Sequence, residues 1–137
     1  MSAVEGIFNA IIAESTITDE LATYKSNPAV FTFAPAPVSV TTKLVTITES
    51  SGSSGNGDRC RREGLVNIDI NVWGEKGDSA TAIREVANNI WKLLDRNRDI
   101  VVPDFTFVKC ACNPPVYSLD PEDFPGFRLS CDVSIWY

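Results

Sequence analysis

The sequence contains no histidine, which excludes Ser-His-Asp and Cys-His catalysis and every histidine-ligated metal site. It also lacks an apolar run approaching the ~18 residues of a membrane span, so we expect no contact with a membrane. The first 13 residues carry Glu5 but no lysine or arginine. Because a signal peptide begins with basic residues, we expect none here.

Basic residues are few compared with acidic ones. The chain has 12 lysines and arginines against 18 acidic residues, for a net charge of −6. The only dense basic cluster is Arg59, Arg61 and Arg62. Since gripping the DNA backbone requires clustered basic side chains, we expect no sequence-specific nucleic acid binding.

Four cysteines are present, Cys60, Cys110, Cys112 and Cys131, and the middle two form a C-x-C pair. A four-thiolate zinc site usually has two C-x2-C pairs, and these are missing. A secreted disulfide framework usually comes with a signal peptide and a smaller chain. The sequence therefore favours reduced, metal-free thiols and no cofactor, with one disulfide or a metal site as the alternatives.

Helical periodicity is clear in two segments. Residues 4–13 place apolar side chains at positions 4, 7, 8, 11 and 12, which form one stripe of an amphipathic helix. A second and longer helix is predicted to begin at Asp78 or Ser79 and to run to about Arg96, with Ile83, Val86 and Ile90 on its apolar face. Between them, Thr18 is predicted to cap a short turn through Thr23.

Strand patterns fill most of the rest of the chain. The clearest is residues 66–73, where Val66, Ile68, Ile70 and Val72 alternate with polar residues and Trp73. The predicted strands span residues 30–33, 38–48, 66–73, 104–112 and 127–137, and turns are predicted at 74–77, 113–115 and 120–126. Residues 49–58 contain no apolar side chain and are predicted to form a flexible loop at the tip of a long hairpin.

This order of elements predicts a single domain over residues 1–137. The fold class is α+β, with a mostly antiparallel β-sheet and two main helices packed on one face. At 137 residues the chain is long enough to bury its own core.

Catalytic candidates are weak throughout. The acidic pairs Glu75 with Asp78 and Glu122 with Asp123 lie in predicted turns, where we expect them to be solvated. The glycine-rich stretch at 52–57 lacks the phosphate-binding motif and precedes a strand rather than a helix. We therefore expect no catalytic, cofactor or metal site, and no enzyme activity.

Two groups of residues are instead candidates for an assembly interface. Trp73 and Trp136 belong to the polar sides of their strands, and aromatic residues are enriched in interface cores, so we favour a subunit contact over a further helix covering them. Arg59, Arg61 and Arg62 lie at the base of the predicted loop. They are candidates to contact an acidic protein surface, and the alternative is an exposed entry to the next strand.

These features together resemble the tail-terminator, or tail-completion, family of tailed bacteriophages and related prophage elements. The resemblance covers most of the chain: the opening helix at 4–13, a proline-containing segment at 35–40, the Gly/Ser loop, and the strand V-N-I-D-I-N-V-W at 66–73 followed by a turn and a helix. The final strand at 128–136 is also similar to the closing strand of that family. The three cysteines at 110, 112 and 131 depart from the family pattern.

The resemblance implies a non-enzymatic structural subunit of the virion, assembled in the host cytoplasm. Its partners would be further copies of itself in a homo-hexameric ring, the tail tube protein and a head-tail connector protein. Such a ring caps the head-proximal end of the tail tube, stops its polymerisation and provides the surface that joins the head. A head-tail connector of the same particle and a small non-viral ligand-binding protein are the alternatives.

Overall fold

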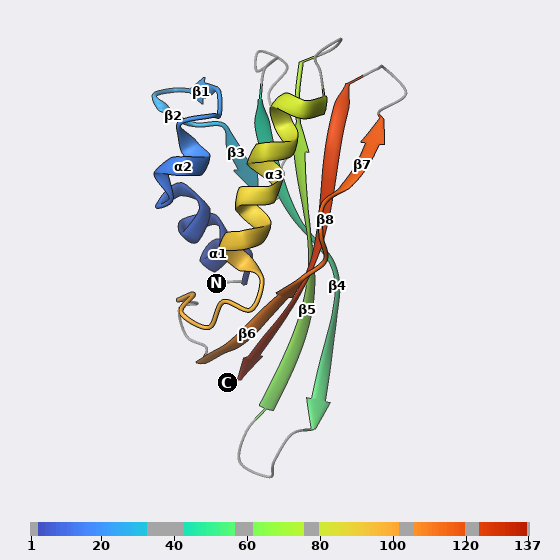
Figure 1. Cartoon of the computed structure of the whole chain (residues 1–137). Coiled ribbons are helices and arrows are strands. Elements are labelled where there is room, and N and C mark those ends of the chain that lie inside the picture. The colour runs from blue at the N-terminus through green and yellow to red at the C-terminus, as the bar shows by residue number, and fades with distance from the viewer. Residues whose placement is uncertain are drawn as a thin grey trace.

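The structure is a computed structural model that describes residues 3–32, 43–56, 62–75, 80–101, 106–119 and 124–136. It has two layers, with helices covering one face of a long twisted β-sheet (Figure 1). This is the α+β architecture that the sequence predicted. Within the described residues, no helix is both long and apolar enough to span a membrane.

Within the described residues, the sheet has six strands in the order β3-β4-β5-β8-β6, with β7 also paired to β8. The β3–β4 pair is parallel, and the β4–β5, β5–β8, β6–β8 and β7–β8 pairs are antiparallel. The bounds are β3 Val30–Thr32, β4 Leu44–Asn56, β5 Arg62–Trp73, β6 Thr106–Cys112, β7 Val116–Leu119 and β8 Pro125–Trp136. A separate hairpin pairs β1 (Thr23–Tyr24) with β2 (Asn27–Pro28).

In the part of the chain that the structure describes, three helices accompany the sheet: α1 Ala3–Ile12, α2 Ser15–Thr18 and α3 Ala80–Leu94. Helices α1 and α3 lie on the same face of the sheet (Figure 1). They confirm the two predicted main helices, although α3 ends two residues before the predicted Arg96. The predicted start of α3 at Asp78 or Ser79 lies outside the described residues.

The core fills the space between the two layers. Alternate residues of the central strands are fully buried, as the predicted period of two requires, and they pack against the apolar stripe of α3. Full burial of one Val, Leu or Ile side chain contributes about 1.5–3 kcal/mol relative to exposure, so these positions dominate stability. The fully buried residues of β5, β8 and α3 include Ile68, Ile70, Val72, Leu129, Val133, Ile83, Val86 and Ile90.

The prediction of a loop over residues 49–58 is wrong for residues 49–56, and residues 57 and 58 lie outside the described residues. Strand β4 continues through Asn56, and its backbone pairs with β5 as far as the Asn56–Arg62 position, with a bulge between Glu49 and Ser51. Backbone pairing requires no apolar side chain, so a polar Gly/Ser segment extends as a strand when a partner strand runs beside it. The paired ends of β4 and β5 project beyond the helices (Figure 1).

Two shorter predictions are wrong in part. Residues Ser15–Thr18 form helix α2, so Thr18 ends a helix, although the predicted turn follows it and Leu21 N–H donates to the Thr18 carbonyl at 3.2 Å. The buried Ile17 anchors this helix to the core. Pro125 and Gly126 begin β8 instead of forming a turn, because the first residue of a strand is a position that tolerates proline, and the Pro125 carbonyl accepts from the Gly74 N–H at 2.9 Å.

Strand β7 was not predicted at all. It follows Pro114 and Pro115 directly and pairs with the start of β8. The ring of Tyr117 packs edge-on against Phe127 with ring centroids 5.6 Å apart. The cross-strand aromatic pair stabilises a strand of only four residues.

Candidate assembly surface

The residues predicted to form an interface fall in different parts of the chain. Arg59 and Arg61 lie outside the described residues. Arg62 is the first residue of β5, opposite Asn56 of β4. Trp73 is the last residue of β5, and Trp136 is the last residue of β8.

The strand register separates the two tryptophans. Trp73 lies opposite Gly126, whereas Trp136 lies opposite Glu63, so ten residues of strand separate the two positions. At about 3.3 Å per residue the separation is roughly 33 Å. The Trp73 and Trp136 positions therefore lie at opposite ends of the β5–β8 pair, and they do not form one patch. Trp136 and Arg62 share one end.

The face of the sheet opposite the helices carries a polar network centred on Asn67. Its side-chain amide donates to Asp132 Oδ1 at 2.6 Å and to Ser130 Oγ at 3.3 Å, both on β8. The hydroxyl of Ser50 on β4 donates to Asn67 Oδ1. The network thus links three adjacent strands across the face, which fixes their side chains in one arrangement.

One ion pair lies beside this network. Arg128 Nη2 donates to Asp69 Oδ2 at 2.9 Å between β8 and β5. The Arg128 side chain is 58% exposed, whereas that of Asp69 is only 14% exposed. The second oxygen of Asp69, Oδ1, is buried and has no hydrogen-bond partner among the described residues.

Exposed apolar side chains occur on the same face. Leu65, opposite Ser134, is 42% exposed, and Val116, opposite Arg128, is 64% exposed. Together with the half-buried Trp73 they make this polar face a mixed surface. Mixed polar and apolar composition is typical of a non-obligate protein interface.

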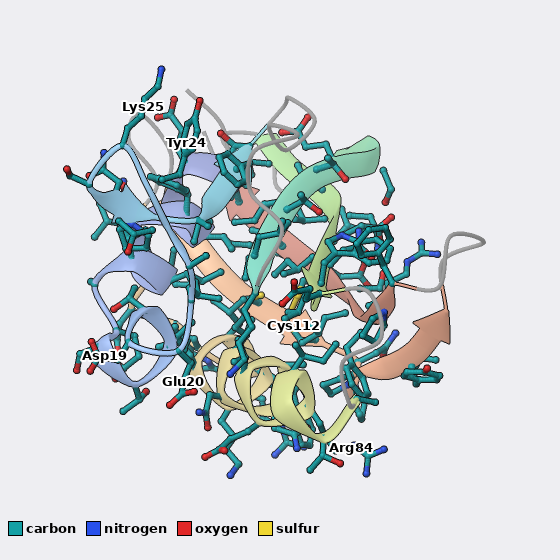
Figure 2. The ribbon with its side chains drawn as sticks, turned by 90° about the horizontal axis from the view of Figure 1, so that it is seen from above. Asp19, Glu20, Tyr24, Lys25, Arg84 and Cys112 are labelled. Carbon is teal, nitrogen blue, oxygen red and sulfur yellow. A yellow bond between two sulfur atoms is a disulfide. The ribbon has the colours of Figure 1, made fainter. Side chains whose placement is uncertain are left out.

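The cysteines depart from the predicted free thiols. Cys112 of β6 lies directly opposite Cys131 of β8, and a disulfide joins them. The third thiol, Cys110, is free, and its Sγ lies 3.6 Å from that of Cys112. All three are buried on the helix-covered face, and Figure 2 shows Cys112 in the interior near α3.

Part of this cluster could be predicted from the sequence. Cys110 and Cys112 are two residues apart and so share a strand face, and Cys131 alternates with core residues of the last strand. The missing information was the register that places Cys112 opposite Cys131. Spacing along the chain does not give the pairing of two strands that are 19 residues apart at this point.

The C-terminal end of α3 binds the free edge of β6 beside these cysteines. Arg96 N–H donates to the Cys110 carbonyl at 2.8 Å, and Cys110 N–H donates to the Asn97 carbonyl at 3.2 Å. Asp95 Oδ1 accepts from Cys112 N–H at 3.1 Å, and Trp91 Nε1 donates to the Cys112 carbonyl at 3.1 Å. These bonds pair the edge groups of β6 that would otherwise be open.

Burial controls the chemistry of the free thiol. Desolvation, with smaller contributions from the negative charges of Asp95 and Asp132, raises the pKa of Cys110 from 9.0 to about 12. The thiol is therefore protonated at neutral pH and is a poor nucleophile.

An open depression lies between α2 and α3. Its lining residues are Glu14, Thr16, Asn89, Lys92 and Leu93. All five remain partly or fully exposed to solvent. A small-molecule site usually encloses its ligand and directs several polar groups at it, and this depression does not have that character.

Comparison with known proteins identifies a shared fold. No protein-family model matches the sequence, and no curated protein matches it. Among solved structures, the chain is similar to one described as "Virion of native gene transfer agent (GTA) particle", with a TM-score of 0.72 and 16% identity. The similarity covers 100% of this chain and 100% of that chain.

Proposed function

We propose that this chain is a structural protein of a phage-like virion and acts as its tail terminator. In this role it forms a homo-hexameric ring at the head-proximal end of the tail tube, stops tube polymerisation and offers a joining surface to the head. Its partners are other copies of itself, the tail tube protein and a head-tail connector protein. The role requires no catalysis, no cofactor and no sequence-specific contact with nucleic acid.

The observation that carries this proposal is the full-length match to a chain of a gene transfer agent virion. A TM-score of 0.72 over 100% of both chains means that the two share the fold along their whole length. The resemblance of residues 66–73 and of the final strand to tail terminators narrows the proposal from a virion protein to this position in the tail.

The surface opposite the helices is the best candidate for contacts between subunits or with the tube. It is mixed in polarity, and its polar side chains are held by the Asn67 network, so little side-chain freedom would be lost when it is covered. Trp73 at one end and Trp136 with Arg62 at the other would then mark two separate contacts.

The net charge of −6 is compatible with DNA passing through such a ring. A lumen that attracted many phosphates would retain DNA and slow its passage, whereas an acidic lumen would not.

A tube-capping experiment tests the proposal directly. The purified chain is added to growing tail tubes, and tube lengths and tube ends are measured by negative-stain electron microscopy. We expect growth to stop and a ring to appear at one end of each tube. A chain that binds a head-side ring but leaves tube growth unchanged would support the head-tail connector instead. A strict monomer that binds neither tubes nor a head-side ring would refute both.

The arginine cluster can be tested in the same assay. Changing Arg59, Arg61 and Arg62 to Glu reverses the charge facing the proposed acidic partner, so we expect weaker capping. The matched control changes Arg84, Lys92 and Arg98 of the α3 region to Glu, which gives the same net charge at another place. If the two triple variants cap tubes equally well, the arginine cluster is not part of the interface.

A further inference from the structure

The three clustered cysteines form a group that the proposed assembly role does not use. Their Sγ atoms all lie within 4.8 Å of one another, and they come from two adjacent strands of the core. We propose that, once its disulfide is reduced, the chain binds one thiophilic divalent cation of the zinc class through Cys110, Cys112 and Cys131.

The spacing of the sulfur atoms fits such an ion. With a Zn–S bond of about 2.3 Å, two sulfurs on a tetrahedral ion lie roughly 3.8 Å apart. The Cys110 and Cys112 sulfurs are already 3.6 Å apart, and the third is within 4.8 Å of both. Three protein ligands suffice for zinc when water takes the fourth position.

The chemistry of the donor set selects the class of ion. Thiolate sulfur favours zinc and cuprous ions over magnesium or calcium, which prefer oxygen. Asp95 and Asp132 add negative charge near Cys110, so a divalent ion offsets more of the local charge than a monovalent one. Zinc is therefore the ion to which the site is best suited.

The strand framework holds the ligands in place before the ion arrives. Cys110 and Cys112 are fixed by backbone hydrogen bonds to the end of α3 on one side and by pairing with β8 on the other. Little reorganisation is needed to bring the three sulfurs together, which lowers the cost of binding.

Disulfide and metal exclude each other at this site. A dithiol reductant transfers two electrons and two protons to the Cys112–Cys131 bond, giving two thiols and the cyclic disulfide of the reductant. Binding of the cation then releases the protons of three thiols as three metal–sulfur bonds form. The oxidised chain retains only the Cys110 thiol in the cluster, so the redox state decides whether the ion binds.

The test uses the full chain, which is reduced anaerobically with a dithiol and then separated from the reductant. Alkylation and mass spectrometry confirm that it has four free thiols. Zinc affinity is measured by competition with a chromophoric chelator, and Cd²⁺ is titrated to follow the ultraviolet charge-transfer band of cadmium–thiolate bonds. We expect one ion per chain with a Kd below about 1 µM at neutral pH. We also expect release of about three protons per ion.

Two single variants locate the site. Cys110→Ser removes one proposed ligand, and since even second-shell changes cost up to 100-fold, we expect affinity to fall at least about 100-fold. Cys60→Ser, at a cysteine outside the described residues, should bind zinc as tightly as the unchanged chain. The oxidised chain should show no charge-transfer band.

The proposal is overturned if the fully reduced chain binds zinc no tighter than the oxidised chain. It is equally overturned if C110S binds as tightly as the unchanged chain, or if the disulfide resists reduction in the folded protein. None of these results depends on tube capping, so the assembly role can fail while the metal site stands, and the reverse.

Discussion

Reduction of the Cys112–Cys131 disulfide should lower the stability of the domain by an amount that can be calculated. The bond closes a loop between residues that are 19 positions apart. In the chain-entropy treatment, a loop of this length removes enough freedom from the unfolded chain to stabilise the fold by about 3 kcal/mol. For a domain of this size, the loss of about 3 kcal/mol lowers Tm by roughly 10–15 °C.

The folded state should change little, because β6 and β8 remain paired without the covalent bond. Their antiparallel register extends from Thr106–Trp136 to Cys112–Cys131, and α3 holds the outer edge of β6 in place. The effect of reduction is therefore expected in the unfolded state and in Tm, while the far-ultraviolet circular dichroism of the folded protein stays the same.

The assay is thermal unfolding of oxidised and reduced protein, with a chelator present so that no metal ion replaces the disulfide. A double variant, Cys112→Ala with Cys131→Ala, is the control, and its Tm should not respond to reductant. A Tm shift under about 2 °C, with complete reduction confirmed by thiol counting, would refute the entropic argument. A loss of folded structure on reduction would refute the claim that strand pairing is sufficient.

Three further predictions concern the core, the outer face and pH. Ile90→Ala, at a fully buried position of α3, should cost about 2–5 kcal/mol in urea unfolding. Asp69→Asn removes the pair with the largely exposed Arg128, so it should cost no more than about 1 kcal/mol and the difference should shrink in high salt, and a larger, salt-independent loss would contradict this. Burial raises the pKa of Cys110 from 9.0 to about 12. The stability that the buried, protonated Cys110 thiol contributes is therefore fully present below pH 9.0 and is lost as the pH approaches 12. Urea unfolding of the wild type and Cys110→Ala should therefore give a stability difference that narrows between pH 8 and pH 10, whereas an unchanged difference would argue against a raised pKa.

The central elements of the fold were predictable because each shows a strong period. Residues 66–73 alternate strictly, and the apolar stripe of α3 recurs every three or four residues, so burial of one face could be inferred for both. For both segments, the hydrophobic period within the segment is enough to predict its secondary structure and its buried face.

The extension of β4 was not predictable in the same way. Its residues from Ser50 to Asn56 are polar or glycine, and their strand conformation depends on pairing with β5. A partner strand supplies backbone hydrogen bonds that the local sequence does not encode. Helix α2 and strand β7 were missed for a related reason, since one buried Ile17 and one ring pair, Tyr117 with Phe127, anchor them.

The candidate interface shows the same limit. The alternation of polar residues placed Trp73 and Trp136 on one face, but the register alone reveals that they lie at opposite ends of it. In the same way, only the pairing of β6 with β8 brings three cysteines together. A single sequence gives the face on which a residue lies far more readily than its neighbours across the sheet.

The end of helix α3 bonds to the edge strand β6 beside the cysteine cluster, and these bonds affect how copies of the chain could contact one another. An open strand edge can grow by adding a strand from another molecule, but Cys110 and Cys112 already use their outer backbone groups to bond Trp91 and the residues that follow α3. Addition of a strand over this part of β6 would require the end of α3 to separate from it. A contact made by strand addition would therefore use the β4 side, where β3 covers only Val45 to Ile47 among the described residues, and the polar face of the sheet stays open to other contacts. A ring built this way would leave the cysteine cluster enclosed, so its oxidation or metal binding would change the stability of each subunit without changing the surface that it presents.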